Sequence, residues 1–375
     1  MKPLIVIDCR TVEGQFTGIG RYAVSLVPLL VAARPDWRFH IFAAPGCEKL
    51  FHGLPGGVSV QAAPPVPWHP RSDWWLHVTL PRWLADHRAA VFFSAANYAP
   101  IYSGATRRAV MIHDLVPFRH PGLDPLKFVL YLRAMLKLSG WVSEVVLANS
   151  KNTAREIETI LGVPRDRIHL TYLGVPKVFR KLQAAELESL VASRPALAGL
   201  PRGFILSVGT HTPRKNFARL IAAMARLPDS ASLVLAGPTG QALRTAQAQA
   251  VSLGVQDRVR FIDYPDDDGL LALYNLAGLF VYPSLYEGFG FPVVEAMACG
   301  TPVACSTASC LPEVAGDAAE MFDPTTEEAI AAALARVLGE PQRASELAAK
   351  GPAQAARFTW EQTAQQTAAA LEKLL

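Results

Sequence analysis

Two glutamates, Glu287 and Glu295, stand eight positions apart in the stretch 284–302, whose sequence is SLYEGFGFPVVEAMACGTP. A glycine turn over 288–290 follows the first, and Pro292 suits the first turn of a helix, because its missing N–H would be unpaired there. A helix start favours an anion, most commonly phosphate. One carboxylate can then bond a sugar hydroxyl and the other a ribose diol. The alternative is a capped helix in which Glu295 only stabilises the dipole.

A second loop carries two adjacent cations. Arg214 and Lys215 lie between an apolar run at 204–209 and a helical pattern that begins near Asn216. Neighbouring cations on such a loop suit a diphosphate, although solvated surface charge is the usual role of an Arg-Lys pair. This loop and the glycine turn follow strands of one predicted sheet, whose carboxyl edge is where ligands bind. The two loops are therefore predicted to meet.

Two loops in the N-terminal half also carry candidate residues. His113 lies in the apolar run 109–114, where Asp114 could orient its ring; a core histidine is the alternative. Gly18 and Gly20 follow the first predicted strand at a longer interval than in a dinucleotide-binding fingerprint. We interpret these glycines as part of a flexible loop near the phosphates of a ligand.

Three adjacent aspartates at 266–268 are candidate ligands for Mg²⁺. They directly precede a helical pattern, where aspartates are ordinary N-terminal caps, so capping is the favoured interpretation. The five cysteines are odd in number and lack zinc-site spacing, which indicates free thiols in a reducing cytoplasm. The sequence therefore predicts no metal and no cofactor.

The 375 residues are enough for about two domains, and 51% of them are hydrophobic. No apolar run reaches the roughly 18 residues of a membrane span, and the N-terminus lacks a signal-peptide pattern, so a cytoplasmic protein is expected. Residues 1–180 carry 21 Lys and Arg against 12 Asp and Glu, whereas the remainder carries 15 against 20. This asymmetry favours an anionic partner or surface for the first half, with chance variation as the alternative; nucleic acid is not an expected partner.

Short apolar runs alternate with helical segments along the whole chain. Their near-continuous hydrophobicity predicts parallel strands in sheets that are covered on both faces. The predicted strands are 4–8, 39–44, 90–95, 109–114, 144–150, 204–209, 232–237, 259–263, 279–284 and 302–306. The predicted helices are 21–33, 125–138, 216–226, 240–253, 268–277, 292–299 and a C-terminal helix after residue 359.

This alternation lapses once, over 181–199, and then restarts. We therefore predict an α/β protein with two Rossmann-like, doubly wound domains, residues 1–180 and 200–358, joined by a linker at 181–199. Each sheet places its ligand crevice at the carboxyl ends of its strands, so two such domains that face each other would enclose a central cleft.

The chain resembles the retaining nucleotide-sugar glycosyltransferases of family 4, which have the GT-B fold. Glu287 and Glu295 fit the family's E-x7-E signature, and the segment YPSLYEGFGFPVVEAMACGTPV is close to its usual wording. The segment GTHTPRKN is similar to the family's diphosphate loop, and TGIGRYA to an N-terminal loop of its polysaccharide-building members. The resemblance covers essentially the whole chain and implies that the last helix, 359–375, joins the first domain.

The resemblance also implies roles for the candidate residues. Arg214 and Lys215 would bind the donor diphosphate and neutralise it in place of a metal ion. Glu287 would contact the transferred sugar, Glu295 the ribose, and His113 would lie near the donor sugar. Residues 288–291 would offer backbone N–H groups to the sugar and phosphate. The implied catalytic residues are Glu287, His113, Arg214 and Lys215. The implied substrate-binding residues are Gly18, Gly20, Gly209, Arg214, Lys215, Glu287, Gly288, Phe289, Gly290, Phe291 and Glu295.

The implied reaction is transfer of a hexose from a nucleotide-sugar donor to a saccharide or lipid-linked saccharide. The forms EGFGFP and TGIGRYA are most similar to bacterial mannosyltransferases that use GDP-mannose in O-antigen or exopolysaccharide assembly. Rhamnosyl or glucosyl transfer from a dTDP-, UDP- or GDP-sugar stays open. So do a sugar-nucleotide epimerase of the same architecture and a non-catalytic scaffold.

The segment 73–88, DWWLHVTLPRWLADHR, is a candidate membrane contact. Its residues Trp74, Trp75 and Trp83 stand among Arg and His, and tryptophans favour the headgroup region of a bilayer. With the basic first half, this segment predicts weak peripheral contact with anionic lipid at the inner face of the cell membrane. The alternative is that at least two of these tryptophans pack in the core.

We expect sugar transfer to survive EDTA, because the Arg214 and Lys215 pair supplies the positive charge that a divalent metal would otherwise bring to a diphosphate. Product formation is measured with chelator and again after Mg²⁺ or Mn²⁺ is added back. Activity that is lost with EDTA and restored by metal would contradict this expectation and favour a metal site at 266–268.

Overall fold

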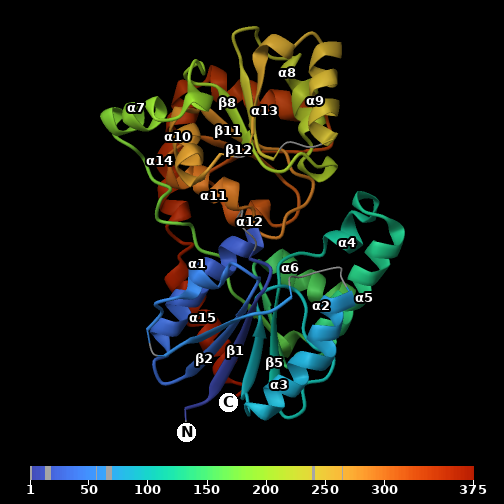
Figure 1. Ribbon diagram of the computed structural model, residues 1–375. Coiled ribbons are helices and arrows are strands. Elements are labelled where there is room, and N and C mark those ends of the chain that lie inside the picture. The colour runs from blue at the N-terminus through green and yellow to red at the C-terminus, as the bar shows by residue number, and fades with distance from the viewer. Residues whose placement is uncertain (1, 13–17, 56, 65–69, 239–240, 264) are drawn as a thin grey trace. The chain divides into compact units, whose positions relative to one another are not determined.

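The computed structural model describes residues 2–12, 18–55, 57–64, 70–238, 241–263 and 265–375. The chain forms two compact units, the first made of Met1–Gly174 with Thr359–Leu375 and the second of Val175–Phe358. Each is a parallel sheet with helices on both faces, so the predicted α/β class with two Rossmann-like units is confirmed (Figure 1). None of the described helices is long and apolar enough to cross a membrane.

The first unit is built on a seven-stranded parallel sheet in the order β3-β2-β1-β4-β5-β6-β7. Its strands are β1 (Leu4–Cys9), β2 (Arg38–Ala43), β3 (Ser59–Ala62), β4 (Val91–Ser94), β5 (Arg107–Ile112), β6 (Val145–Ala148) and β7 (Ile168–Leu170). All six residues of the apolar strand β1 are buried, as expected of a strand that is covered on both faces.

Helices α1 (Gly18–Ala33) and α15 (Trp360–Glu372) pack together, and α3 (Leu80–Asp86) and α5 (Leu126–Val142) cover the face of the sheet away from them (Figure 1). The C-terminal helix thus lies in the first unit. The shorter helices are α2 (Pro70–Trp74), α4 (Val116–Arg119) and α6 (Lys151–Glu156), with tighter or wider turns at Glu48–Phe51, Trp75–Thr79, Pro121–Leu123, Ile157–Leu161 and Arg165–Arg167.

The second unit has a six-stranded parallel sheet in the order β10-β9-β8-β11-β12-β13. Its strands are β8 (Ile205–Val208), β9 (Leu233–Ala236), β10 (Val259–Ile262), β11 (Leu279–Tyr282), β12 (Val303–Ser306) and β13 (Glu320–Phe322). Its helices are α7 (Ala184–Ala192), α8 (Phe217–Met224), α9 (Gln241–Ser252), α10 (Asp267–Leu276), α11 (Phe291–Ala298), α12 (Leu311–Ala315), α13 (Glu327–Gly339) and α14 (Pro341–Ala355), with short turns at Pro195–Leu197, Pro213–Lys215 and Gln256–Arg258.

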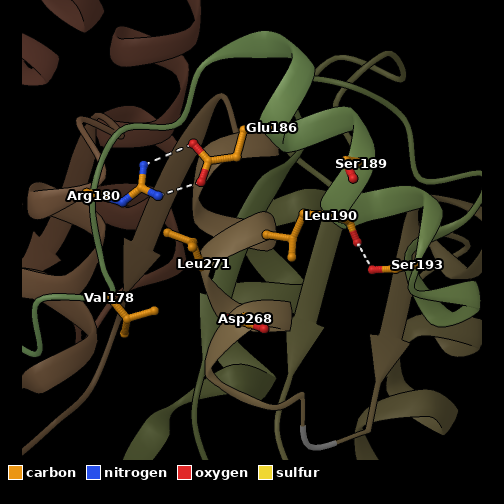
Figure 2. Close-up of a pocket in the computed structure, with 8 residues that line it drawn as sticks. All are labelled: Val178, Arg180, Glu186, Ser189, Leu190, Ser193, Asp268 and Leu271. Carbon is orange, nitrogen blue, oxygen red and sulfur yellow. Dashed lines mark hydrogen bonds and ion pairs between the residues drawn. The ribbon is translucent and has the colours of Figure 1, made fainter.

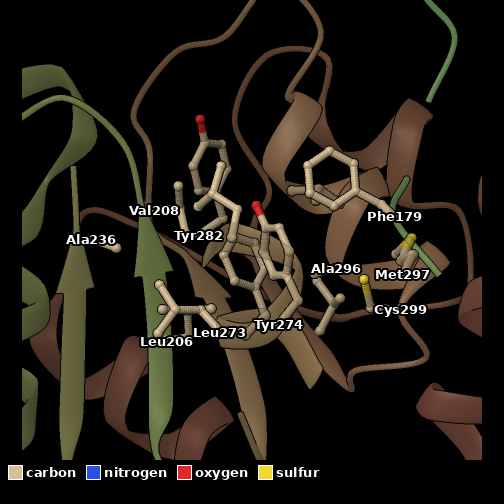
Figure 3. Close-up of a cluster of buried hydrophobic side chains, with 14 of the residues drawn as sticks. Phe179, Leu206, Val208, Ala236, Leu273, Tyr274, Tyr282, Ala296, Met297 and Cys299 are labelled. Atoms are coloured by element: carbon tan, nitrogen blue, oxygen red, sulfur yellow. The ribbon is translucent and has the colours of Figure 1, made fainter. Parts of the chain in front are cut away.

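Two tyrosines stand out in the core on one face of the second sheet. Figure 3 shows Tyr274 of α10 and Tyr282 of β11 among apolar side chains such as Leu206 and Leu273. The ring of Phe280 packs against both, with centroids 5.5 Å from Tyr274 and 5.9 Å from Tyr282. The rings are therefore held rigidly, and each carries one hydroxyl group that needs a hydrogen-bond partner.

All of the predicted strands are present, but β3, β7 and β13 are not among the predictions. Each of the three lies at an edge of its sheet and has only three or four residues, and β3 exposes most of its side chains. An edge strand packs against fewer neighbours and needs no continuous apolar run. The prediction of strands from the sequence relies on such a run, so it does not detect these three strands.

The segment 181–199 is part of the second unit and not a free linker. It contains α7, which packs against α10. The side chain of Asn275 on α10 donates to the Arg180 carbonyl at 3.0 Å and accepts from the Leu182 N–H at 2.9 Å. The units therefore divide after Gly174, not at residue 180, because the connecting chain is already bonded to the second unit where the apolar alternation lapses.

The tryptophans of segment 73–88 have different environments. Trp75 is buried beneath the Arg10 guanidinium, whose carbon lies 3.9 Å from the ring centroid. Trp83 packs on the core and stacks on His87 at 3.8 Å. Only Trp74 is exposed, at 65%. The alternative that at least two of them pack in the core is thus confirmed.

We predict that Gly174→Ala destabilises the first unit, because an added Cβ would lie 2.2 Å from the backbone nitrogen of Trp360, where α15 begins. Overpacking against backbone costs about 1–3 kcal/mol. Gly122→Ala is the matched control, since its Cβ would meet nothing within 4 Å. Calorimetric melting should show a lower transition temperature for Gly174→Ala alone. Equal melting of both variants would mean that this close approach does not constrain the fold.

Candidate functional site

The candidate site lies at the point where the strand order of the second sheet reverses, between β8 and β11. Ligands bind outside the carboxyl ends of the strands at such a point. The loops that leave the two strands are bonded to each other. The Leu285 N–H donates to the Arg214 carbonyl at 2.9 Å, and the Asn216 amide donates to the Pro283 carbonyl at 3.0 Å. The two loops that the sequence singled out therefore meet.

Glu287 is the centre of a buried ion-pair cluster between these loops. Its Oε1 accepts a hydrogen bond from Lys215 Nζ at 2.6 Å and another from Ser284 Oγ at 2.6 Å. A third comes from the Tyr282 hydroxyl at 2.9 Å. The Oε2 atom pairs with Arg214 at 2.9 Å. Two cations thus share one carboxylate, and the cluster has one positive charge in excess.

The side chain of Lys215 passes close to Gly209, which has no side chain, on its way to Glu287. An added Cβ at Gly209 would lie 3.2 Å from Lys215 Cε, so the lysine stem crosses this glycine closely. A Cβ at Gly237, which follows β9, would lie 2.0 Å from the Gly209 carbonyl oxygen. Gly209 therefore positions Lys215, and its own contact with a ligand stays a prediction.

The charge state of Glu287 follows from this cluster. Burial by itself would raise the pKa of the carboxyl. The charges of Lys215 and Arg214, with hydrogen bonds from Lys215 and Ser284, outweigh burial and lower the pKa to about 2. Glu287 is therefore anionic at neutral pH. It can accept hydrogen bonds and stabilise positive charge, but it has no proton to donate.

A core tyrosine holds each of the two glutamates. Tyr282 donates to Glu287, and Tyr274 donates to Glu295 Oε2 at 2.9 Å. Burial and the neighbouring carboxylates raise the pKa of both phenols well above its usual value, so both stay protonated donors. Sequence reasoning missed them because they belong to apolar runs. The available signal was a tyrosine in the same strand-to-loop segment as Glu287.

The glycine turn before α11 has a backbone that favours glycine. Gly290 has a φ of 95°, and an added Cβ would collide with a leucine of α12 at 2.7 Å. Phe289 is buried against Phe291 and Phe358, with centroids 5.5 and 5.4 Å away. The side chain of Phe289 therefore packs in the core, and only the backbone of the turn is suited to bind a ligand. The contacts of 288–291 with a sugar or phosphate stay predictions.

His113 follows β5 in the first unit, where its ring is buried. Its Nε2 bonds the Ala95 carbonyl at 2.8 Å, which places the proton on Nε2 and leaves Nδ1 as an acceptor. Burial lowers the pKa of the imidazole against smaller opposing contributions, so the ring is neutral at pH 7. Tyr22 of the TGIGRYA segment packs edge-on against it at 4.9 Å. The Ala95 carbonyl therefore orients the ring, and the Asp114 carboxylate accepts the Val116 N–H at 3.0 Å instead.

Gly18 and Gly20 lie in the first turn of α1 and not in a flexible loop as predicted. Gly20 is buried and Gly18 is exposed, whereas residues 13–17 lie outside the described part of the chain. The apolar residues that follow face the core, and their packing outweighs the low helix propensity of glycine. The role of Gly18 and Gly20 near the phosphates of a ligand stays a prediction.

The aspartates at 266–268 serve the fold of α10. Asp266 caps this helix, accepting the Gly269 N–H at 2.7 Å. Arg194 pairs with Asp266 at 3.1 Å and with Asp268 at 3.0 Å. Among the described residues, no group of three or more His, Cys, Asp or Glu could hold a metal ion. The structure thus supports the capping interpretation.

A surface pocket of about 530 Å³ lies on the second unit (Figure 2). The segment 178–193 and helix α10 form it, and an ion pair joins Arg180 to Glu186 at its side. Its lining residues are Val178, Arg180, Glu186, Ser189, Leu190, Ser193, Asp268 and Leu271. None of the predicted catalytic or substrate-binding residues lines it, so it is not part of the candidate site.

Solved structures establish the class of the fold. Sucrose-phosphate synthase from Thermosynechococcus elongatus superposes with a TM-score of 0.77 at 23% identity, covering 100% of this chain and 99% of that one. Anabaena HepE, in complex with UDP-glucose, gives 0.77 at 18% identity, covering 99% and 100%. With two doubly wound units and a cation–carboxylate cluster at the switch point of the second, the protein is a GT-B protein.

The sequence comparisons establish the family. Residues 16–177 match the family model for Glycosyltransferase Family 4, and residues 195–354 match the model for Glycosyl transferases group 1. O-antigen chain mannosyltransferase B of Escherichia coli is 30% identical over 97% of this chain and 98% of its own length. The serotype-specific mannosyltransferase WbdA of E. coli is 33% identical over 67% of this chain, which spans 32% of that longer protein. The chain belongs to the family 4 glycosyltransferases.

The lowered pKa of Glu287 predicts a pH dependence of stability. The folded-state pKa is about 2 against an ordinary 4.5, so the unfolded chain binds the proton first as pH falls. The stabilisation is complete above about pH 4.5 and is lost towards pH 2, by about 3 kcal/mol for a shift of this size. Urea unfolding across this range should show a shallower loss in Glu287→Gln than in the wild type. If the free energy of unfolding fell equally with pH in Glu287→Gln and in the wild type, the ion-paired state of Glu287 would be contradicted.

Proposed function

We propose that the protein is a retaining mannosyltransferase that moves mannose from GDP-mannose to a saccharide or lipid-linked saccharide in cell-surface polysaccharide synthesis. The observation that carries the choice of sugar is the full-length relationship to the O-antigen chain mannosyltransferase. A second mannosyltransferase of E. coli and one of Mycolicibacterium hassiacum, 31% identical over 61% of this chain, support it. A lipid-linked acceptor would place the reaction at the cytoplasmic face of the cell membrane.

The positive excess of the cluster supports binding of a diphosphate. A nucleoside diphosphate that enters beside Arg214 and Lys215 would accept hydrogen bonds from their N–H donors. Its negative charge grows as the bond to the sugar breaks, so fixed cations bind the transition state more tightly than the donor. In this proposal the two side chains supply the charge neutralisation that a metal ion supplies elsewhere, and transfer needs no metal.

Glu287 would stabilise the positive charge that develops on the sugar. Its pKa of about 2 keeps it anionic, and three hydrogen bonds with an ion pair to Arg214 occupy its oxygens. A carboxylate so heavily engaged is a weak nucleophile. This favours retention by a front-face, ion-pair-like route over a double displacement. Glu295, held by Tyr274, would bind the ribose diol of the donor.

Two other functions are kept for specific reasons. Rhamnosyl or glucosyl transfer shares the same cluster, since a diphosphate is common to all nucleotide sugars. An epimerase of the same architecture would consume the donor without any acceptor. Donor consumption measured with and without acceptor separates the epimerase from a transferase, and a thermal-shift screen of nucleotide sugars separates the donors.

Substitutions in the two loops test whether Lys215 binds the diphosphate and Glu287 acts on the sugar. Lys215→Ala should weaken calorimetric binding of GDP roughly 10- to 150-fold, because it deletes a charge-assisted contact of about 1.5–3 kcal/mol, and should slow transfer. Glu287→Gln should leave GDP affinity nearly unchanged and lower kcat strongly. Arg226→Ala, an exposed ion-pair residue of the same unit, is the control.

The anomeric configuration of the product, read by NMR, tests retention. The proposal for the sugar fails if GDP-mannose gives no thermal shift and no product while another nucleotide sugar gives both. The assignment of the loops fails if Glu287→Gln loses GDP binding and keeps turnover at saturation.

A further inference from the structure

The exposed large apolar side chains of the first unit concentrate around α5. Leu126, Leu130 and Trp141 are 69%, 53% and 61% exposed, and Leu138 is exposed too. At 3.6 residues per turn these four positions fall within an arc of roughly 120°. Other side chains of α5, such as Leu136, pack in the core. Large apolar side chains therefore lie on the solvent face of the helix as well as on its core face, and a helix of that kind is normally covered on both.

Two segments that are bonded to α5 carry further exposed apolar side chains. Exposed Trp74 follows Asp73, whose carboxylate accepts the Tyr131 hydroxyl of α5 at 2.5 Å. Exposed Ile101 and Tyr102 follow Ala99, whose N–H donates to Ser139 of α5 at 3.0 Å. Apart from the C-terminal leucine, all exposed large apolar residues described in this unit lie on α5 or on these two segments.

The charge of α5 has one sign. The helix carries Lys127, Arg133 and Lys137 and no Asp or Glu. Lys127 and Lys137 are exposed beside the apolar residues, and Arg167 donates to the Trp141 carbonyl at 3.4 Å. Asp124 is the exposed acid just before the helix. Lys127 and Lys137 fall within the same arc as the apolar residues, so a face that is both apolar and basic is presented over about 25 Å, the length of 17 helical residues.

We propose that this α5 face, with the exposed Trp74, Ile101 and Tyr102, lies in the interface of an anionic lipid membrane. Leucines and tryptophan enter the boundary between headgroups and acyl chains, while the lysines contact lipid phosphates. A second copy docked on the same face by two-fold symmetry would bring like charges together, which disfavours a dimer. The surface differs from the one expected at 73–88, since Trp75 and Trp83 are occupied by the core.

The contact does not depend on which sugar is transferred. It is tested with the full-length protein by co-sedimentation with phosphatidylcholine vesicles that contain or lack phosphatidylglycerol. The wild type should bind the anionic vesicles more strongly, and added salt should weaken binding. Leu130→Glu combined with Trp141→Glu should reduce binding at least tenfold. Val251→Glu, at a residue 64% exposed on α9 of the second unit, is the matched control and should bind like the wild type.

Charge reversal separates the electrostatic contribution of the lysines from the contribution of the inserted apolar side chains. Lys127→Glu combined with Lys137→Glu should weaken binding to anionic vesicles about tenfold or more and leave binding to phosphatidylcholine unchanged. Melting curves verify that each variant is folded. Transfer to a water-soluble acceptor should be unchanged in all of them, so a failure here is distinct from a failure of the proposed function.

Three outcomes would overturn the proposal. They are no vesicle binding by the wild type at low salt, equal binding to neutral and anionic vesicles, or equal loss in Val251→Glu. A concentration-dependent dimer that Leu130→Glu with Trp141→Glu abolishes would assign the face to a second copy instead.

Discussion

A carboxylate buried between two cations is the interaction on which the rest of the second unit depends. Removing charges from water costs several kcal/mol per ion, and the cost is offset only when geometry and hydrogen bonds are satisfied. Glu287 meets this condition with Lys215, Arg214 and hydroxyl donors. The adjacency of β8 and β11, the close approach at Gly209 and the rigid ring of Tyr282 all serve to hold these groups in place.

The same cluster connects stability to chemistry. Its excess positive charge suits an anionic ligand, and its carboxylate stays ionised because two cations lower its pKa. A group with such a pKa contributes stability at neutral pH and cannot act as an acid. Tyr274 donates a hydrogen bond to Glu295, as Tyr282 does to Glu287. The two glutamates of the family signature are therefore each held by a tyrosine hydroxyl from the same hydrophobic core. The core therefore sets the geometry of the polar site above it.

Tryptophans of the first unit show how burial decides the role of a residue type. Trp75 and Trp83 lie near each other in sequence with Trp74, yet two pack in the core and one faces solvent. Trp141, which no pattern singled out, is exposed on α5. The fate of each side chain depends on which face of its helix meets the sheet. Composition and local charge around a tryptophan do not contain that information.

The amino-acid sequence by itself determined the α/β class, the buried strands and the two loops with Glu287, Arg214 and Lys215, because apolar runs and polar residues at strand ends are local patterns. Only the tertiary structure decided the edge strands, the division after Gly174 and the pairing of Glu295 with Tyr274. These depend on contacts between segments far apart in the chain. Their strength comes from burial and close approach, which exist only once the chain has folded.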